Sequence, residues 1–323
     1  MKVSDLGEFG LIELLSKIVS KENNPQILVG IGDDAAAWHS DDSTLLATTD
    51  TLVQGVHFTE ESTWIELGWK AMAINLSDIA AMGGIPKYAL VSLSLPGNTE
   101  VDDVTQLYHG LAEAAGQFKI SIVGGNISSA PVVMISLMVL GQAYPDGILT
   151  RSAAVPGDLI ATTGYLGSSA AGLAMLNNHL QFDKETIDFL RGAHLKPQPR
   201  IAEGQLLVKK GVRAAIDISD GLVADLGHIC KASQVGATIE IELIPVNPKV
   251  RSAFPEDYLD FALAGGEDFE LLFTASRKVI EDIRTAVYLP VSIIGEVTRG
   301  EGITLLDKEN KSYPVVKKGW EHF

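Results

Sequence analysis

Two aspartates and a serine surround one glycine in the stretch from Asp217 to Leu222, Asp-Ile-Ser-Asp-Gly-Leu. The β-like run from Val212 to Ile216 precedes this stretch, and a helical pattern from Leu222 to Ala232 follows it. A strand that leads into a short acidic turn and then a helix holds its polar side chains at the carboxyl end of the strand, where ligands bind in α/β sheets. Crowded carboxylates repel one another, so we expect a cation at this corner.

The same arrangement, an apolar β-like run that ends in glycine and aspartate or asparagine, recurs along the chain. The other corners are Gly30 to Asp34, Thr48 to Asp50, Gly124 to Asn126 and Gly265 to Asp268. Each acid taken alone is more often a helix cap or a turn residue, and it is the recurrence that favours metal binding. Oxygen ligands without a histidine or cysteine cluster select Mg²⁺ or a similarly hard ion, which is most often shared with substrate phosphates. The corners therefore indicate phosphoryl or nucleotide chemistry.

Strands and helices alternate along the chain, but not in strict βαβ order, which predicts an α/β or α+β architecture. A strong helical period runs from Trp64 to Met82, and a second helix is expected from Ile201 to Lys209. Strands are expected at residues 27–31, 44–49, 88–95, 120–123, 132–140, 159–163, 238–244, 271–274, 291–296 and 303–306. A chain of 323 residues exceeds the ~250–300 that one core usually holds, so we expect two domains, residues 1–148 and 149–323.

Composition excludes several classes of partner. The net charge of −16 argues against nucleic acid or an anionic membrane surface. The longest apolar run, Val132 to Leu140, is too short to cross a bilayer, which takes ~20 residues. The single cysteine, Cys230, excludes an internal disulfide and suits a reducing compartment, so we expect a cytoplasmic protein.

Two nucleotide-binding motifs can be weighed and set aside. Gly30 to Ala35 matches the loose dinucleotide pattern, but Asp33 and Asp34 would face a pyrophosphate without an intervening cation. No glycine-rich loop ends in Gly-Lys-Ser or Gly-Lys-Thr, so a P-loop is absent from the sequence. His57 lies in a predicted loop, where a general acid and a hydrogen-bonded loop histidine are equally good interpretations.

Six segments together resemble the thiamine-monophosphate kinase family, which belongs to a superfamily of ATP-using enzymes that includes aminoimidazole ribonucleotide synthetase. They are GIGDDAA (Gly30–Ala36), TTDTLVQGVHF (Thr48–Phe58), NLSDIAAMG (Asn75–Gly83), DISDGL (Asp217–Leu222), GGEDFEL (Gly265–Leu271) and GWEHF (Gly319–Phe323). The resemblance implies a two-domain aminoimidazole ribonucleotide synthetase-like fold whose N-terminal domain forms a dimeric β-barrel interface. It also implies phosphorylation of thiamine monophosphate to thiamine diphosphate by ATP, with several Mg²⁺ ions, in a homodimer.

The resemblance also implies roles for individual residues. The expected metal ligands are Asp34, Thr48, Thr49, Asp50, Asp78, Asn126, Asp217 and Asp220, with Asp33 as a supporting acid. The expected ATP contacts are Gly125, Asn126, Arg151 and Ser219, and the expected thiamine monophosphate contacts are His57, Glu267 and Trp320. Catalysis would rest on Asp50, Asp217, Asp220 and Arg151. Asn126 stands where the family commonly has aspartate, so one metal site is expected to be weaker.

Some of these residues have a plain structural interpretation as well. Arg151 could be a surface arginine beside the domain linker, Glu267 could cap the next strand, and Trp320 could dock the tail onto the body of the protein. Two other functions also stay open at this point. One is a related ATP-dependent synthetase of the same superfamily, and the other is a non-catalytic acidic protein that only binds metal.

Overall fold

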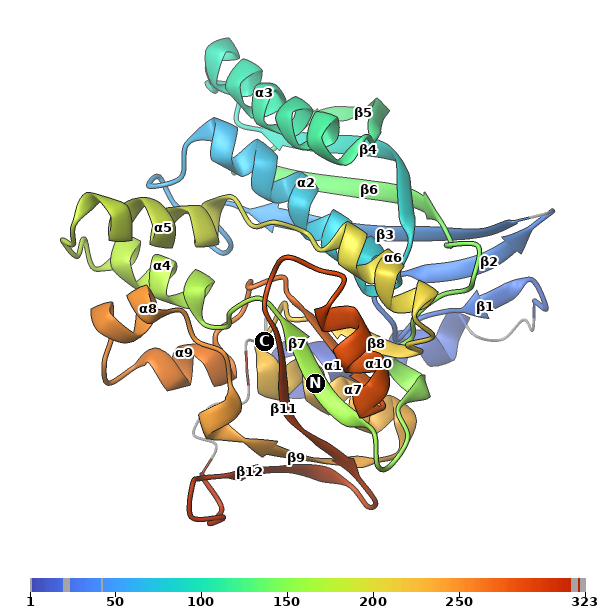
Figure 1. Cartoon of the computed structure of the whole chain (residues 1–323). Helices are drawn as coiled ribbons and strands as arrows, with labels where there is room; N and C mark the ends of the chain where they lie inside the picture. Colours follow the sequence, from blue (N-terminus) through green and yellow to red (C-terminus); the bar gives the residue numbers. More distant parts are fainter. Residues whose placement is uncertain (1, 20–23, 42, 315–318, 320–323) are drawn as a thin grey trace.

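The computed structural model describes residues 2–19, 24–41, 43–314 and 319. The chain forms two six-stranded sheets with helices packed on them (Figure 1). The first sheet has the order β1-β2-β3-β6-β4-β5. Its strands are β1 Ile27–Val29, β2 Ala36–Ser40, β3 Ser43–Val53, β4 Ile85–Leu95, β5 Ser121–Ser129 and β6 Met134–Gln142. Only the β4–β5 pair is parallel, and the other neighbours are antiparallel.

Two long helices, α2 Trp64–Ala81 and α3 Val101–Phe118, cover one face of the first sheet (Figure 1). Helix α2 begins with a capping box in which Thr63 and Glu66 satisfy each other's backbone N–H groups. Gly68 lets α2 and α3 approach closely, because a Cβ atom at this position would lie 2.0 Å from the Leu107 carbonyl oxygen. The close approach buries most of α2.

The second sheet has the order β12-β9-β11-β7-β10-β8, and only its β12–β9 pair is parallel. Its strands are β7 Leu159–Thr163, β8 Ala214–Asp217, β9 Gly236–Glu240, β10 Leu271–Ala275, β11 Val291–Thr298 and β12 Gly302–Leu306. The remaining α-helices are α1 Val3–Val19, α4 Ser168–Asn177, α5 Lys184–Leu195, α6 Ile201–Lys209, α7 Leu222–Ser233, α8 Pro248–Ala253, α9 Tyr258–Ala264 and α10 Arg277–Arg284. No described helix is long and apolar enough to cross a membrane.

A buried apolar cluster joins the two halves of the molecule. Ala80 and Ala81, at the end of α2, pack with Leu207 of α6 and with Ala215 and Phe273 of the second sheet. The end of α2 is thereby fixed against β8. This packing brings Asp78 of α2 beside Asp217 at the end of β8.

The expected two-part mixture of strands and helices is confirmed, but the expected barrel is not found. Both sheets are open in the described part of the chain, since each strand order has two different ends. The first sheet ends with β6 at Gln142 and the second begins with β7 at Leu159, and the boundary after residue 148 stays a prediction. Three predicted elements coincide closely with α2, α6 and β7.

Other predicted elements need correction. Strand β2 and helix α5 were not expected. Thr48 to Asp50 does not end a strand, because β3 continues to Val53, and Gly124 to Asn126 lies inside β5. The strand predicted to reach residue 244 ends at Glu240, where a 3-10 turn replaces it.

Candidate active site

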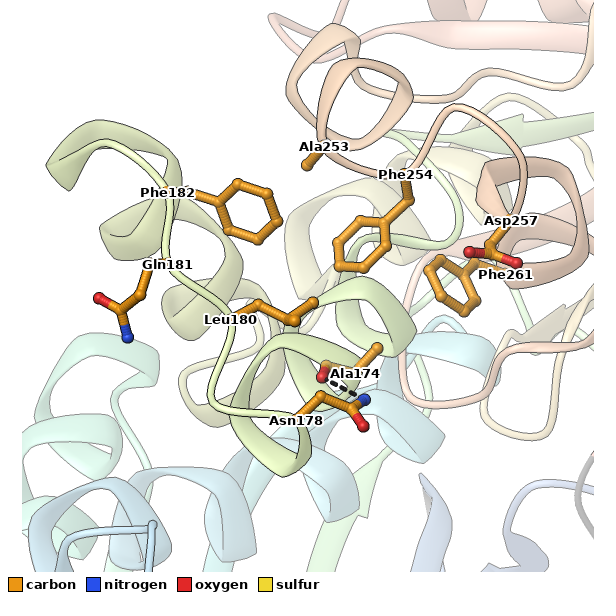
Figure 2. Close-up of a pocket in the computed structure, with 9 residues that line it drawn as sticks. All are labelled: Ala174, Asn178, Leu180, Gln181, Phe182, Ala253, Phe254, Asp257 and Phe261. Atoms are coloured by element: carbon orange, nitrogen blue, oxygen red, sulfur yellow. Dashed lines mark hydrogen bonds between the residues drawn. The ribbon is translucent and has the colours of Figure 1, made fainter.

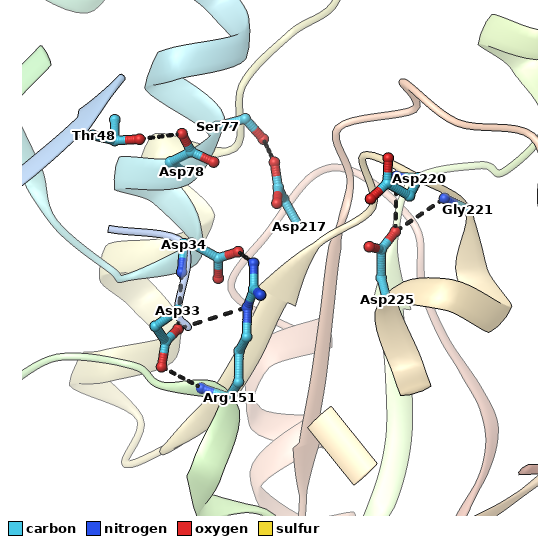
Figure 3. Close-up of polar contacts among 10 residues, drawn as sticks. All are labelled: Asp33, Asp34, Thr48, Ser77, Asp78, Arg151, Asp217, Asp220, Gly221 and Asp225. Carbon is cyan, nitrogen blue, oxygen red and sulfur yellow. Dashed lines mark hydrogen bonds and ion pairs between the residues drawn. The ribbon is translucent and has the colours of Figure 1, made fainter. Parts of the chain in front are cut away.

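Three carboxylates from distant parts of the chain meet between the two halves of the molecule (Figure 3). Asp34 comes from the turn between β1 and β2, Asp78 from α2, and Asp217 from the end of β8. One oxygen from each lies within 4.8 Å of the others. We call these three residues the acidic cluster.

Hydroxyl groups fix the orientation of the acidic cluster. The Ser77 hydroxyl donates to Asp217 at 2.5 Å, and the Thr48 hydroxyl donates to Asp78 at 2.5 Å. The backbone N–H of Asp50 donates to the Asn75 side chain at 3.0 Å, which ties β3 to α2. Thr48 and Asp50 therefore face α2, as the two-residue period of a strand requires.

The same strand period separates Thr49 from the acidic cluster. Thr49 is opposite Met138 on β6, and Met138 is opposite Leu90 on β4, in a row whose side chains are exposed. The Thr49 hydroxyl donates to the Leu137 carbonyl oxygen at 2.8 Å. The structure thus places Thr48 and Asp50 on the helix-covered face of the sheet and the Thr49 side chain on its open face.

Arg151 closes one side of the acidic cluster. Its guanidinium forms an ion pair with Asp34, and its Nε lies 3.8 Å from a carboxylate oxygen of Asp33. Its backbone N–H also donates to Asp33 at 3.1 Å. The interpretation of Arg151 as a surface residue is therefore wrong. The second carboxylate oxygen of Asp34 is buried and has no hydrogen-bond partner among the described residues.

Burial and mutual repulsion raise the pKa values of acids in the cluster and of the neighbouring Asp50, which favours their protonated forms. Burial raises the pKa of Asp34 to about 8, although the charge of Arg151 opposes the shift. Burial and the nearby Asp217 raise the pKa of Asp50 to about 6. The pKa of Asp78 is raised well above its ordinary value by burial and by Asp50. A bound divalent cation would compensate these charges, and the all-oxygen donor set fits a hard ion such as Mg²⁺.

Asp220 belongs to a separate group, on the far side of Asp217 (Figure 3). Ligand atoms of Asp220, Asp225 and His228 lie within 4.8 Å of one another. Asp225 accepts hydrogen bonds from the N–H groups of Asp220 at 3.1 Å and Gly221 at 3.0 Å. Burial lowers the pKa of His228 to about 4, so its ring is neutral at pH 7 and able to bind a metal.

Asp225 and His228 were missed at the level of the sequence. The signal that could have found them is their spacing of three residues in the helix after the acidic turn, which places both side chains on one face.

Two of the predicted ATP contacts, Gly125 and Asn126, lie in the exposed edge strand β5. A Cβ atom on Gly125 would lie 1.8 Å from the Val91 carbonyl oxygen, so only glycine fits there. Asn126 is opposite Ser92, which is opposite Ser136, in a row on the open face of the sheet. The strand register therefore places Asn126 on the face opposite to Asp50.

Two of the predicted substrate contacts, Glu267 and His57, are described by the structure, and Glu267 lies in the Gly265 corner. The backbone N–H of Glu267 donates to the Ser219 carbonyl oxygen at 2.7 Å, so the ATP-binding and substrate-binding predictions meet there. The Nδ1 atom of His57 accepts a hydrogen bond from the backbone of Val53 at 3.0 Å, which leaves Nε2 as the second polar atom of the ring. Trp320 lies outside the described residues.

A hollow of about 710 Å³ lies elsewhere, between α4 and the α8–α9 segment (Figure 2). Its aromatic side chains are Phe182, Phe254 and Phe261, whose rings meet edge to face. None of the predicted site residues lines this hollow. The acidic cluster is therefore the better candidate for the chemistry.

Comparisons with known proteins agree with the two-part architecture. Residues 32–143 match the N-terminal domain of AIR synthase related proteins, and residues 155–308 match the C-terminal domain of the same family. The thiamine-monophosphate kinase of Escherichia coli O157:H7 is 39% identical over 98% of both chains. The thiamine-monophosphate kinase of Aquifex aeolicus is 37% identical over the full length of both chains.

Solved structures show the same similarity. A structure described as AaThiL complexed with AMPPCP and TMP superposes with a TM-score of 0.90 at 36% identity, covering 100% of this chain and 99% of the other. The hydrogenase maturation protein HypE of Escherichia coli shares the fold at 20% identity, with a TM-score of 0.72 and coverage of 96% and 98%.

Proposed function

The chain belongs to the thiamine-monophosphate kinases of the AIR synthase related family, and from this premise we propose that its acidic cluster is the centre of phosphoryl transfer. The protein is an enzyme that phosphorylates thiamine monophosphate with ATP, giving thiamine diphosphate and ADP. The observation that supports the location is the meeting of Asp34, Asp78 and Asp217 from both halves of the chain. The related structure described with AMPPCP and TMP supports the substrates.

Magnesium ions are part of the proposal. Asp34, Asp50, Asp78 and Asp217 would hold Mg²⁺, and the unpartnered buried oxygen of Asp34 supports this assignment. Asp220, with Asp225 and His228, would hold a further ion. When bound, Mg²⁺ neutralises phosphate charge and so lets one phosphate approach another.

The reaction needs positioning and charge compensation more than it needs a base. The terminal phosphate of thiamine monophosphate has a second pKa of ~6, so at neutral pH it is a dianion able to attack unaided. One of its oxygens forms a bond to the γ-phosphorus of ATP while the bond from that phosphorus to the bridging oxygen breaks and ADP leaves. Arg151 lies beside the acidic cluster, where its charge would stabilise the phosphate oxygens of the transition state.

The remaining roles are those that the family resemblance implies. Ser219, Gly125 and Asn126 would contact ATP, and His57, Glu267 and Trp320 would contact thiamine monophosphate. Ser219 and Glu267 share a backbone hydrogen bond, which supports adjacent binding of the two substrates. The half before residue 148 would supply Asp34, Asp50 and Asp78, and the half after it would supply Arg151 and Asp217. A cytoplasmic location stays a prediction.

We also propose that two copies of the chain pair through the open face of the first sheet. Tyr88, Leu90 and Met138 are 52%, 37% and 42% exposed on that face, whereas the alternating residues Val91 and Leu137 are fully buried beneath the helices. A contiguous exposed apolar patch of this kind is typical of an interface. A second copy placed on this face would also cover the neighbourhood of Asn126 and Thr49.

A coupled assay of ADP release tests the proposed function. Purified protein with ATP and Mg²⁺ should release ADP when thiamine monophosphate is added and should not do so with thiamine, which has no phosphate to attack with. Chelation of Mg²⁺ should abolish the release. ADP release that is independent of thiamine monophosphate, or no release at saturating ATP and Mg²⁺, would contradict the proposal.

A further inference from the structure

A lysine is buried inside helix α2 beside the predicted substrate-binding glutamate. The Lys70 side chain is 1% exposed, and its ammonium lies 2.9 Å from Oε2 of Glu267. A buried lysine is costly unless its charge is paired. Lys70 comes from the first half of the chain and Glu267 from the second, so the ion pair bridges the two halves.

A histidine from a third element contacts the same carboxylate oxygen. His194, at the end of α5, places Nδ1 3.4 Å from Oε2 of Glu267 and 3.0 Å from the Ser169 hydroxyl. Burial lowers the pKa of His194 to about 4, so at neutral pH it contributes a neutral ring and not a second charge. Lys70 is therefore the main charge partner of Glu267 in its immediate surroundings.

The ion pair decides the charge state and the orientation of Glu267. Burial raises the pKa of this carboxyl, but the charges around it, Lys70 first, outweigh burial and leave the pKa below its ordinary value. The Glu267 side chain is 28% exposed, and Oε1 makes no hydrogen bond to any described residue. The charge of His57 also lowers the pKa of Glu267, so the two predicted substrate contacts are near enough to interact electrostatically.

We propose that Lys70 is a positioning residue for thiamine monophosphate. Its ammonium engages Oε2 of Glu267 and leaves Oε1, ionised and fixed, to accept a hydrogen bond from the amino group of the substrate's pyrimidine. This inference rests on the proposed function, because it assigns Lys70 to the substrate side of the same site. A lysine that only held the two halves together would affect ATP and thiamine monophosphate alike.

Steady-state kinetics of four proteins test the assignment: wild type, Lys70→Met, Glu267→Gln and the double variant. Lys70→Met should raise the KM for thiamine monophosphate by about tenfold or more, as loss of a charged hydrogen-bond partner does, with the KM for ATP within about twofold of wild type. Because Lys70 acts through Glu267, the double variant should show no larger KM than Glu267→Gln alone.

The double variant also keeps the test interpretable if Lys70→Met fails to fold. Lys70→Met leaves a carboxylate without its partner and so destabilises the folded protein, whereas the double variant removes both charges and is expected to fold. Lys196→Met is the matched control, because Lys196 also forms an ion pair between the two halves, with Glu113, and does not contact Glu267. This control should leave both KM values unchanged.

Three results would overturn the assignment. The KM for thiamine monophosphate could stay unchanged in Lys70→Met, both KM values could rise together, or the effects of Lys70→Met and Glu267→Gln could simply multiply in the double variant. Wild-type protein that releases no ADP with thiamine monophosphate would overturn the proposed function itself. Active wild type with any of the three results would overturn only the role of Lys70.

Discussion

The Ser77 hydroxyl donates a hydrogen bond of 2.5 Å to Oδ2 of Asp217, and this contact joins helix α2 to the end of strand β8. Both side chains are buried, with 0% and 2% of their surfaces exposed. A charged acceptor and a hydroxyl donor make a strong hydrogen bond at such a site. The orientation of Asp217 is thus fixed by a residue from the other half of the chain before any substrate binds.

Replacement of Asp217 by asparagine removes the negative charge of the side chain but keeps nearly the same shape. Asparagine can still accept the Ser77 hydrogen bond, but it cannot neutralise a divalent cation. We expect Asp217→Asn to lower kcat by about 100-fold or more while the melting temperature stays at or above that of wild type, since burial disfavours the native carboxylate and outweighs the opposing charge of Arg151. ADP release and circular dichroism measure the two quantities.

The control for this variant is Asp282→Asn, an exposed position on α10. It removes the same charge far from the acidic cluster in sequence and should keep the wild-type rate. A near-normal rate for Asp217→Asn at saturating Mg²⁺ would contradict the assignment of Asp217 as a metal ligand.

The sequence predicted the acidic residues better than it predicted their surroundings. Asp34 and Asp217 follow from short local patterns of glycine and aspartate, Asp78 follows from the family resemblance, and α2 follows from its apolar period. Thr49 was grouped with Thr48 and Asp50 because the family resemblance implies that all three are metal ligands. Because β3 continues through all three residues, successive side chains point to opposite faces of the sheet, so Thr49 lies on the face opposite to Thr48 and Asp50.

Lys70 and His194 could not be predicted from local patterns. A lysine in a helix is normally exposed to solvent, but Lys70 is buried. Its ion pair with Glu267, which is 197 residues away in the sequence, explains this burial. The helix that carries His194 was missed because its sequence is rich in charged residues and its apolar face is narrow. The burial of these residues depends on contacts between segments that are distant in the sequence.

The contact between α2 and α3 provides a test of packing. A Cβ atom on Gly68 would lie 2.0 Å from the Leu107 carbonyl oxygen, so Gly68→Ala must push the helices apart. We expect it to lower the free energy of unfolding by about 2–4 kcal/mol, as overpacking of a tight core does. Urea unfolding followed by circular dichroism measures the change.

Gly116→Ala serves as the comparison for Gly68→Ala. Gly116 is exposed on α3, and a Cβ atom there would meet nothing within 4 Å. Alanine should therefore raise the free energy of unfolding by about 0.5–1 kcal/mol, because it restricts the unfolded chain. Equal effects of the two substitutions would contradict the close packing of α2 on α3.

The proposed dimer can be tested with a charge on the open face of the first sheet. Leu90→Glu places a carboxylate directly opposite Met138 on that face and should shift the protein from dimer to monomer. Analytical ultracentrifugation measures the mass. Val101→Glu is the control, since Val101 is 81% exposed at the start of α3 and is not in that row. A monomeric wild type, or a dimer that survives Leu90→Glu, would exclude this face as the interface.

The raised pKa values of the acidic residues predict how stability depends on pH when no divalent cation is present. The pKa of Asp34 is about 8 and that of Asp50 about 6, both above the ordinary 3.8, so the folded state binds more protons than the unfolded state between these limits. Stability should therefore fall as pH rises from about 4 to about 8. With chelator present, we expect the melting temperature to be several degrees lower at pH 8 than at pH 5.

Mg²⁺ should remove most of this loss, because it binds the ionised carboxylates of the folded state only. Its stabilising effect should thus be larger at pH 8 than at pH 5, as differential scanning calorimetry can measure. The variant Asp34→Asn with Asp50→Asn should reduce both effects. Part of the pH dependence will remain, since burial also raises the pKa of Asp78, within the cluster, well above its ordinary value and raises that of Asp268, outside the cluster, to about 7. Stabilisation by Mg²⁺ that is equal at both pH values would contradict cation binding at these acids.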